Sequence, residues 1–255
     1  MKCDLSNKNQ VNNIFDNIKP DIIIHTAALI DIDYCEKNKE LSYLYNVKST
    51  ENIITWINSQ SNKNKIKLVF ISSDQVYGKC KNNIENNGSP LNTYGRHKYL
   101  SEKKVRKIKN YLVLRTNFLS KGVKKTSLTD WIVDSFLSKK SFDLFNNVYF
   151  NPLSVQKLSK IIFRMVRLNL IGTYNLGSTY YNAQISKADF AIMLAKKLKI
   201  YNKNYNLKSF NKSKHFVNRP NNLIMKIDKI EKYIKMPSIK VVLSDIVKIY
   251  RNEKE

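Results

Sequence analysis

Residues Lys67 to Gly78, KLVFISSDQVYG, are the stretch from which the arrangement of the rest of the chain follows. The first half is an apolar run, Leu68 to Ile71, that stops at two hydroxyls and a carboxylate. This composition is typical of a strand buried on both faces of a parallel sheet. Sixteen residues beyond Gly78, Tyr94 and Lys98 stand four positions apart. Because residues four apart share one face of a helix, the pattern predicts a serine at a strand end facing a tyrosine and a lysine.

The segments on both sides of this stretch alternate between helical and extended patterns. Apolar residues at helical spacing precede Pro20, and a second apolar strand pattern follows at residues 21–25. Further helices are predicted at 39–60, 94–109 and 126–139, and a further strand at 111–115. Such alternation indicates an α/β fold, a doubly wound parallel sheet of the Rossmann-like type.

Beyond residue 140 the alternation loosens. A helix is predicted over 154–168, and another begins near Ser186, with Asp189 placed three residues later as a capping partner. We therefore expect two parts. Residues 1–145 form a dinucleotide-binding domain that carries the catalytic residues, and residues 146–255 form mainly a small α+β substrate-binding lobe with elements returning to the sheet.

Composition narrows the class of protein. The 255 residues are 42% hydrophobic, and no apolar run approaches the roughly eighteen residues that a membrane helix needs. The start does not have the pattern of a signal peptide, and the three cysteines stand in no metal-ligand spacing. A net charge of +25 is spread along the whole chain rather than clustered. We expect a cytoplasmic protein with reduced thiols, no metal, no specific nucleic-acid partner and no membrane partner.

The spacing of Tyr94 and Lys98 is weak evidence by itself, since between two and three Tyr-x-x-x-Lys/Arg matches arise by chance from this composition. Tyr77 and Lys81 match as well, but they lie in a predicted loop and share no face. A phenol has a pKa of about 10, which a nearby ammonium lowers. We therefore predict that Lys98 lowers the pKa of Tyr94, and that Ser73 fixes a substrate oxygen so that the phenol can pass its proton.

Ser73, Tyr94 and Lys98, after a strand that ends ISSDQVYG, resemble the extended short-chain dehydrogenase/reductases, and within them the dTDP-4-dehydrorhamnose reductase family. The resemblance covers essentially the whole chain. It implies NADPH- or NADH-dependent reduction of a nucleotide-linked 4-keto-6-deoxysugar for deoxysugar or surface polysaccharide biosynthesis, with Tyr94 as proton donor. A nucleotide sugar is then the partner, and a homodimer is left open.

The same resemblance implies further site residues. The cofactor would be bound by Asp4, Leu5, Ala27, Ala28 and Lys98, and the substrate by Gln75, Phe118, Arg219 and Asn222. The family usually has Thr, Asp and Tyr where this chain has Ser73, Asp74 and Gln75, and Trp at the position of Phe118. Both departures fall where the sugar would lie, so the sugar is left open.

The six glycines stand at 78, 88, 95, 122, 172 and 177, so no glycine-rich turn precedes the first predicted strand. In the family such a turn holds the cofactor diphosphate. The resemblance implies an N-terminally truncated sheet that exposes the edge of strand 21–25, and we expect Met1 to be internal to a longer reading frame. Two alternatives remain: a nucleotide-sugar epimerase or dehydratase, and a non-catalytic regulatory or binding subunit that has lost cofactor binding.

Overall fold

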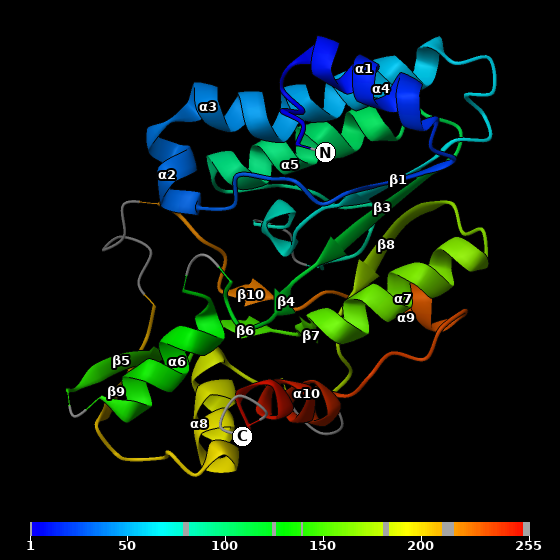
Figure 1. The fold of residues 1–255 in the computed structure, drawn as a ribbon. Helices are drawn as coiled ribbons and strands as arrows, with labels where there is room; N and C mark the ends of the chain where they lie inside the picture. The colour runs from blue at the N-terminus through cyan, green and yellow to red at the C-terminus, as the bar shows by residue number, and fades with distance from the viewer. Residues whose placement is uncertain are drawn as a thin grey trace. The chain divides into compact units, whose positions relative to one another are not determined.

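The computed structural model describes residues 2–78, 82–123, 126–138, 140–180, 184–210 and 217–251 (Figure 1). They form two compact units. The first contains the described residues of 2–115, 170–174 and 217–220, and the second contains those of 116–169, 175–210 and 221–251. The division after Arg115 falls earlier in the chain than residue 145, because the segments that follow pack among themselves.

The sheet has four strands in the order β1 (Ile22–His25), β2 (Lys67–Ile71), β3 (Tyr111–Thr116) and β8 (Gly172–Leu176). β1 pairs in parallel with β2, and β2 in parallel with β3. The predicted α/β fold with a parallel sheet is confirmed. β2 is buried along nearly its whole length, as its uninterrupted apolar composition predicted.

β1 is an edge strand of the sheet, as the sequence led us to expect. Its side chains alternate, with Ile23 and His25 buried, while Ile22 and Ile24 are 46% and 51% exposed. The buried side chains face a core that also contains Trp56 and Phe70. One face of the edge strand is therefore covered within the first unit and the other is open.

Helices alternate with these strands along the chain. Those of the first unit are α1 (Lys8–Ile18), α2 (Ile32–Lys37), α3 (Lys39–Tyr43), α4 (Ser49–Ser59) and α5 (Thr93–Val105), with the π-helical turn η1 (Leu44–Lys48) and the 3₁₀ turn η2 (Asp74–Val76). The helix predicted over 39–60 is thus α3, η1 and α4 in continuous succession. α2 is too short to show a periodic pattern and was not predicted.

The second unit contains short parallel strand pairs and longer helices. The pairs are β10 (Asn222–Leu223) with β6 (Tyr149–Phe150), β4 (Phe118–Leu119) with β7 (Leu153–Ser154), and β5 (Phe142–Phe145) with β9 (Tyr205–Lys208). The helices are α6 (Leu128–Leu137), α7 (Val155–Arg167), α8 (Lys187–Leu198), α9 (Asp228–Glu231) and α10 (Ile239–Arg251). The predicted capping box of α8 is present, since Ser186 and Asp189 bond each other's backbone amides.

Two further findings concern only the described ranges. No helix there has the length and apolar composition that a bilayer span requires. No three His, Cys, Asp or Glu side chains there gather as metal ligands. Cys3 and Cys35 are free thiols, whereas Cys80 and Lys81 lie outside the described residues.

Candidate active site

Ser73 lies two residues past the carboxyl end of β2, as predicted, and it is the N-cap of η2. Its Oγ accepts a hydrogen bond from the Gln75 amide at 3.2 Å and donates to Asp74 Oδ1 at 3.1 Å. Ser73 is 8% exposed and Asp74 is 3% exposed. The turn therefore holds a hydroxyl and a carboxylate at the strand end, where the sequence places them.

Tyr94 and Lys98 lie on one side of α5 and are both buried. Burial raises the pKa of the Tyr94 phenol above its usual range; a hydrogen bond with the Ser73 side chain acts in the opposite direction, and the charge of Asp74 raises the pKa further. Burial therefore raises the pKa of Tyr94 overall, and the effect of Lys98 on this pKa stays a prediction. The cost of burying a phenolate is larger than any favourable interaction that the site supplies.

The Lys98 ammonium lies 4.0 Å above the centre of the Phe70 ring rather than close to a carboxylate. Burial lowers the pKa of Lys98 to about 7, although the charge of Glu102 acts to raise it. A cation over an aromatic face is stabilised by the ring quadrupole, and this stabilisation is smaller than that of a buried ion pair. The Lys98 amine thus titrates close to neutral pH, one helical turn after Tyr94 on the same side of α5.

Glu102 continues the row of side chains that starts with Tyr94 and Lys98, each four residues after the last. It is fully buried and forms a two-pronged ion pair with Arg115, also fully buried, at the end of β3. Glu102 also accepts a hydrogen bond from Ser72 Oγ at 2.5 Å. Because Ser72 immediately precedes Ser73, this buried pair joins α5, β2 and β3 at the strand ends.

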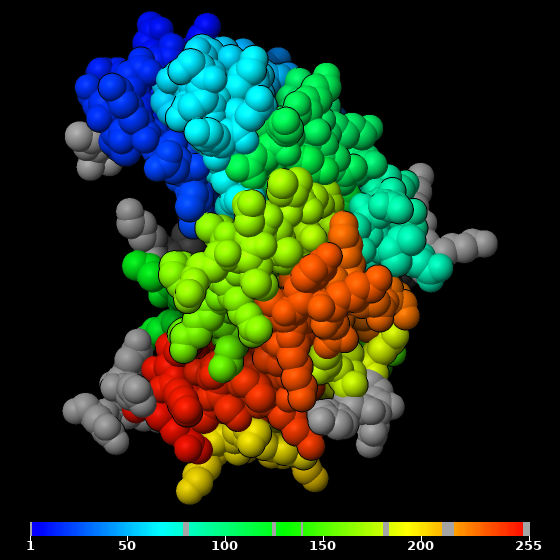
Figure 2. All heavy atoms as spheres, turned by 90° about the vertical axis from the view of Figure 1, so that its right-hand side faces the viewer, coloured from blue at the N-terminus to red at the C-terminus, as the bar shows by residue number. Residues whose placement is uncertain are grey.

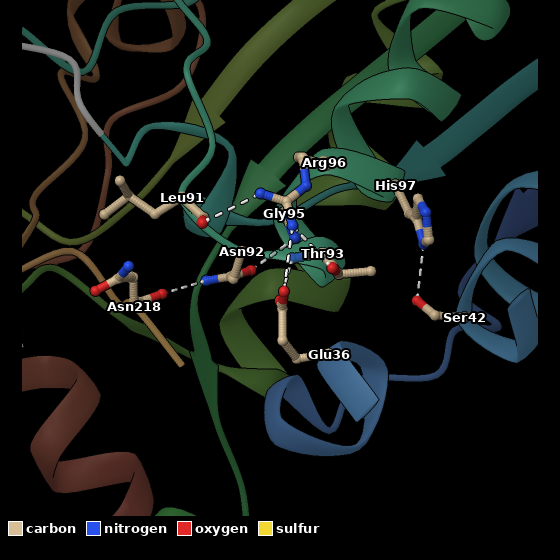
Figure 3. Close-up of polar contacts among 9 residues, drawn as sticks. All are labelled: Glu36, Ser42, Leu91, Asn92, Thr93, Gly95, Arg96, His97 and Asn218. Atoms are coloured by element: carbon tan, nitrogen blue, oxygen red, sulfur yellow. Dashed lines mark hydrogen bonds and ion pairs between the residues drawn. The ribbon is translucent and has the colours of Figure 1, made fainter. Parts of the chain in front are cut away.

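Asn92 and Glu36 hold the start of α5 in place (Figure 3). Asn92 is the N-cap and accepts from the Gly95 amide at 2.9 Å, while its own amide donates to Gln75 Oε1 and to the carbonyl of Asn218. From α2, Glu36 accepts from the Thr93 amide at 2.8 Å and pairs with Arg96 at 3.3 Å. The segment that carries Tyr94 is therefore bonded to the Ser73 turn, to α2 and to residues 217–220.

Each histidine of the described residues has a ring nitrogen close to a hydroxyl group. His25 is buried at the end of β1, where burial, and secondarily the charge of Lys98, lowers its pKa to about 3. Its Nε2 is 3.1 Å from Thr50 Oγ1. His97 Nδ1 lies 2.8 Å from the Ser42 hydroxyl (Figure 3). Burial lowers the pKa of His97 as well.

The residues expected to bind the cofactor all lie in the first unit. Asp4 is exposed, and its carboxylate accepts from the backbone and hydroxyl of Ser6, which lowers its pKa. The Leu5 carbonyl accepts from the Asn52 side chain at 2.9 Å, so the segment before α1 is fixed against α4. Ala27 is exposed and Ala28 partly buried just after β1. Their small side chains leave the backbone there open to a close approach.

The residues expected to bind substrate are divided between the units. Gln75 is buried beside Ser73, and Arg219 pairs with Asp33 of α2 at 2.6 Å, both within the first unit. Phe118, 49% exposed, and Asn222, whose side chain accepts from the Ile224 amide, belong to the second unit. Sequence reasoning missed Asn92, Glu36 and Glu102. Two of them left a signal: Asn92 is a preferred N-cap residue at the start of the helix, and Glu102 continues the spacing of Tyr94 and Lys98.

The sheet and the Ser73, Tyr94 and Lys98 arrangement at its strand ends define a fold of the short-chain dehydrogenase/reductase class. Within that class, the chain belongs to the family described as RmlD substrate binding domain, whose model matches residues 1–252.

Several characterised proteins are similar to the chain. dTDP-4-dehydrorhamnose reductase of Salmonella typhimurium is 26% identical over 171 residues, 66% of this chain and 56% of that protein. A probable low-salt glycan biosynthesis reductase of Haloferax volcanii is 22% identical over 197 residues, 74% of this chain and 63% of that protein. The matches thus span less than two thirds of these relatives. The structure of dTDP-4-dehydrorhamnose reductase from Bacillus anthracis in complex with NADP superposes with a TM-score of 0.85 at 25% identity, covering 96% of this chain and 86% of that one.

Proposed function

We propose that the protein is a sugar-nucleotide reductase that uses NADPH or NADH to reduce the keto group of a nucleotide-linked 4-keto-6-deoxysugar. The observation that carries the proposal is the buried Tyr94 phenol, whose pKa the nearby Ser73 side chain acts to lower, followed one helical turn later by the buried amine of Lys98. The relatives named as dTDP-4-dehydrorhamnose reductases support this substrate class. We place the reaction in cytoplasmic deoxysugar synthesis for polysaccharides.

Each of the three residues has one role in this proposal. When bound, the nicotinamide supplies the hydride that adds to the keto carbon. Ser73 orients the keto oxygen, and Tyr94 donates its phenolic proton to that oxygen as negative charge develops there. The raised pKa of Tyr94 keeps the phenol protonated before the reaction. The Lys98 ammonium stabilises the phenolate formed by proton transfer until the phenolate takes up a proton.

The residues fit the reacting half of the cofactor better than its diphosphate. Lys98 and the open backbone at Ala27 and Ala28 would hold the nicotinamide and its ribose, and Asp4 and Leu5 would lie at the adenosine end. No two of the six glycines stand within four residues of each other, so this sequence contains no glycine-rich turn of the kind that admits a diphosphate. That observation favours the second candidate, a non-catalytic binding subunit of the same fold.

The experiment compares the wild-type protein with Tyr94→Phe and follows NADPH or NADH oxidation with a dTDP-4-keto-6-deoxysugar. Tyr43→Phe is the matched control, since Tyr43 is 40% exposed on α3. We expect Tyr94→Phe to lower kcat by about 10²-fold or more, with an unchanged unfolding midpoint, and the control to retain activity. Turnover by Tyr94→Phe at the wild-type rate contradicts the role of Tyr94. A wild-type protein that binds the nucleotide sugar without turnover supports the non-catalytic candidate.

A further inference from the structure

A basic groove of about 470 Å³ lies in the second unit, far along the chain from Ser73, Tyr94 and Lys98. It is bounded by α7 on one side and by the segment that joins α9 to α10 on the other. Figure 2 shows these two segments side by side, in yellow-green and orange. Four of its lining side chains are cationic, and none is acidic. The four are Lys157, Lys160, Arg164 and Lys235.

The absence of acids on α7 distinguishes it from the other long helices of the described residues. Seven helices there have ten or more residues, and each of the other six contains at least one Asp or Glu. The sequence of α7, VQKLSKIIFRMVR, contains none. Four of its apolar side chains, including Leu158 and Ile161, are buried in the second unit, whereas Phe163 is 65% exposed. The helix therefore lines the groove with three cationic side chains and one apolar side chain, Lys157, Lys160, Arg164 and Ile161.

These cations are not neutralised locally. The side chains of Lys157, Lys160, Arg164 and Lys235 form no ion pair or hydrogen bond with any other described residue, whereas elsewhere Lys104 bonds Glu51 and Lys208 bonds Asp143, each at 2.7 Å. The floor beneath them is apolar and includes Ile161 and Met236, both buried. Positive charge above a floor of low polarity is screened less than on a flat surface, so the groove concentrates an attractive potential for anions.

We propose that this groove binds a small, freely diffusing anion that carries phosphate groups, of the size of an organic diphosphate. Lys160 and Arg164 from α7 and Lys235 from the opposite wall can surround one diphosphate, which a single row of lysines on a convex surface cannot do. The start of α10 contributes little, because the amides of Ile239 and Val242 already bond backbone carbonyls.

The shape of the groove and the number of its cations favour a small anion over a lipid surface or a nucleic acid. A lipid headgroup layer is planar and makes contact with projecting side chains rather than with the walls of a recess. A nucleic acid that binds through its phosphates requires about six to ten cationic contacts along its length, whereas four cations line this groove. A compact polyanion of the volume typical of small-molecule sites fits the recess.

The test is isothermal titration of the full chain with inorganic pyrophosphate at low salt. The variant is Lys160→Glu with Arg164→Glu. The matched control is Lys197→Glu with Lys248→Glu, which makes the same change in net charge at exposed positions of α8 and α10. We expect the groove variant to weaken pyrophosphate binding by about tenfold or more, and the control by less than twofold. Raising the salt concentration weakens binding to the wild type, because these charges are only partly shielded from solvent.

Three outcomes overturn the proposal: no pyrophosphate binding by the wild type, equal weakening in both variants, or groove-dependent binding only to anionic vesicles or duplex DNA. Lys235→Glu, on the opposite wall, provides an independent variant outside α7 and is expected to weaken pyrophosphate binding as well. Since all these positions lie outside the proposed active site, reductase turnover by the groove variants should match the wild type. The proposed anion site in the groove can therefore be disproved independently of the proposed reductase activity.

Discussion

Replacing Gly95 by alanine tests how closely α5 must approach the Ser73 turn. Gly95 follows Tyr94 directly, and a Cβ built on it would lie 2.4 Å from the backbone oxygen of Gln75 and 3.0 Å from Pro90 Cβ. Ordinary contact begins near 3.4 Å, so the helix or the turn must move by about 1 Å. The obstructing atom belongs to the backbone of the turn that carries Ser73, so a side-chain rotation cannot relieve the contact.

The sign of the change in the free energy of unfolding on Gly95→Ala tests whether α5 approaches the Ser73 turn this closely. In a helix without such contact, Gly→Ala stabilises by up to about 1 kcal/mol, because alanine loses less conformational entropy on folding. Overpacking in a buried site costs about 1 to 3 kcal/mol. We therefore expect Gly95→Ala to lower the free energy of unfolding. A displacement of about 1 Å between Tyr94 and Ser73 should also lower turnover by about 10²-fold.

Urea unfolding measures the first effect, and NADPH oxidation by the proposed reaction measures the second. Gly88→Ala is the matched control, because its Cβ would meet the ring of Tyr99 at 2.4 Å rather than the Ser73 turn. We expect the control to lose stability while retaining more turnover than Gly95→Ala. A Gly95→Ala protein that is more stable than wild type and fully active would refute the close approach and the positioning argument built on it.

Two further predictions concern the buried titratable side chains of Glu102 and His25. Glu102→Gln leaves the buried Arg115 charge without its counter-ion and should lower the free energy of unfolding in urea by about 3 to 5 kcal/mol. The control Glu51→Gln breaks only partly exposed ion pairs and should lower it by at most about 1 kcal/mol. Equal losses in the two variants would contradict the estimate for Glu102. His25 has a pKa of about 3 in the folded protein against 6.5 when unfolded, so between these values the unfolded state binds the extra proton and stability falls as pH falls. The loss attributable to His25 is about 4 kcal/mol at pH 3. Between about pH 4 and about pH 7, the free energy of unfolding of His25→Gln should depend less steeply on pH than that of the wild type. An unchanged slope would argue against a neutral, buried His25.

Local patterns predicted most of the first unit. The strands at 21–25, 67–71 and 111–115 and the helix containing Tyr94 are found within a few residues of their expected bounds, because periodicity and apolar runs are properties of neighbouring residues. The capping box at Ser186 was read from sequence for the same reason. α10 was not predicted, although its buried residues recur at helical spacing.

The sequence by itself determined the α/β alternation and the order of Ser73, Tyr94 and Lys98, since strand ends and helical spacing place these residues through local geometry alone. Only the tertiary structure decided which buried partner each charge receives. Glu102 pairs with Arg115 and Glu36 reaches the start of α5 through contacts between distant segments. The direction of the Tyr94 pKa shift depends on burial from all sides. Burial and long-range pairing are properties of the packed chain, and no spacing between neighbouring residues encodes them.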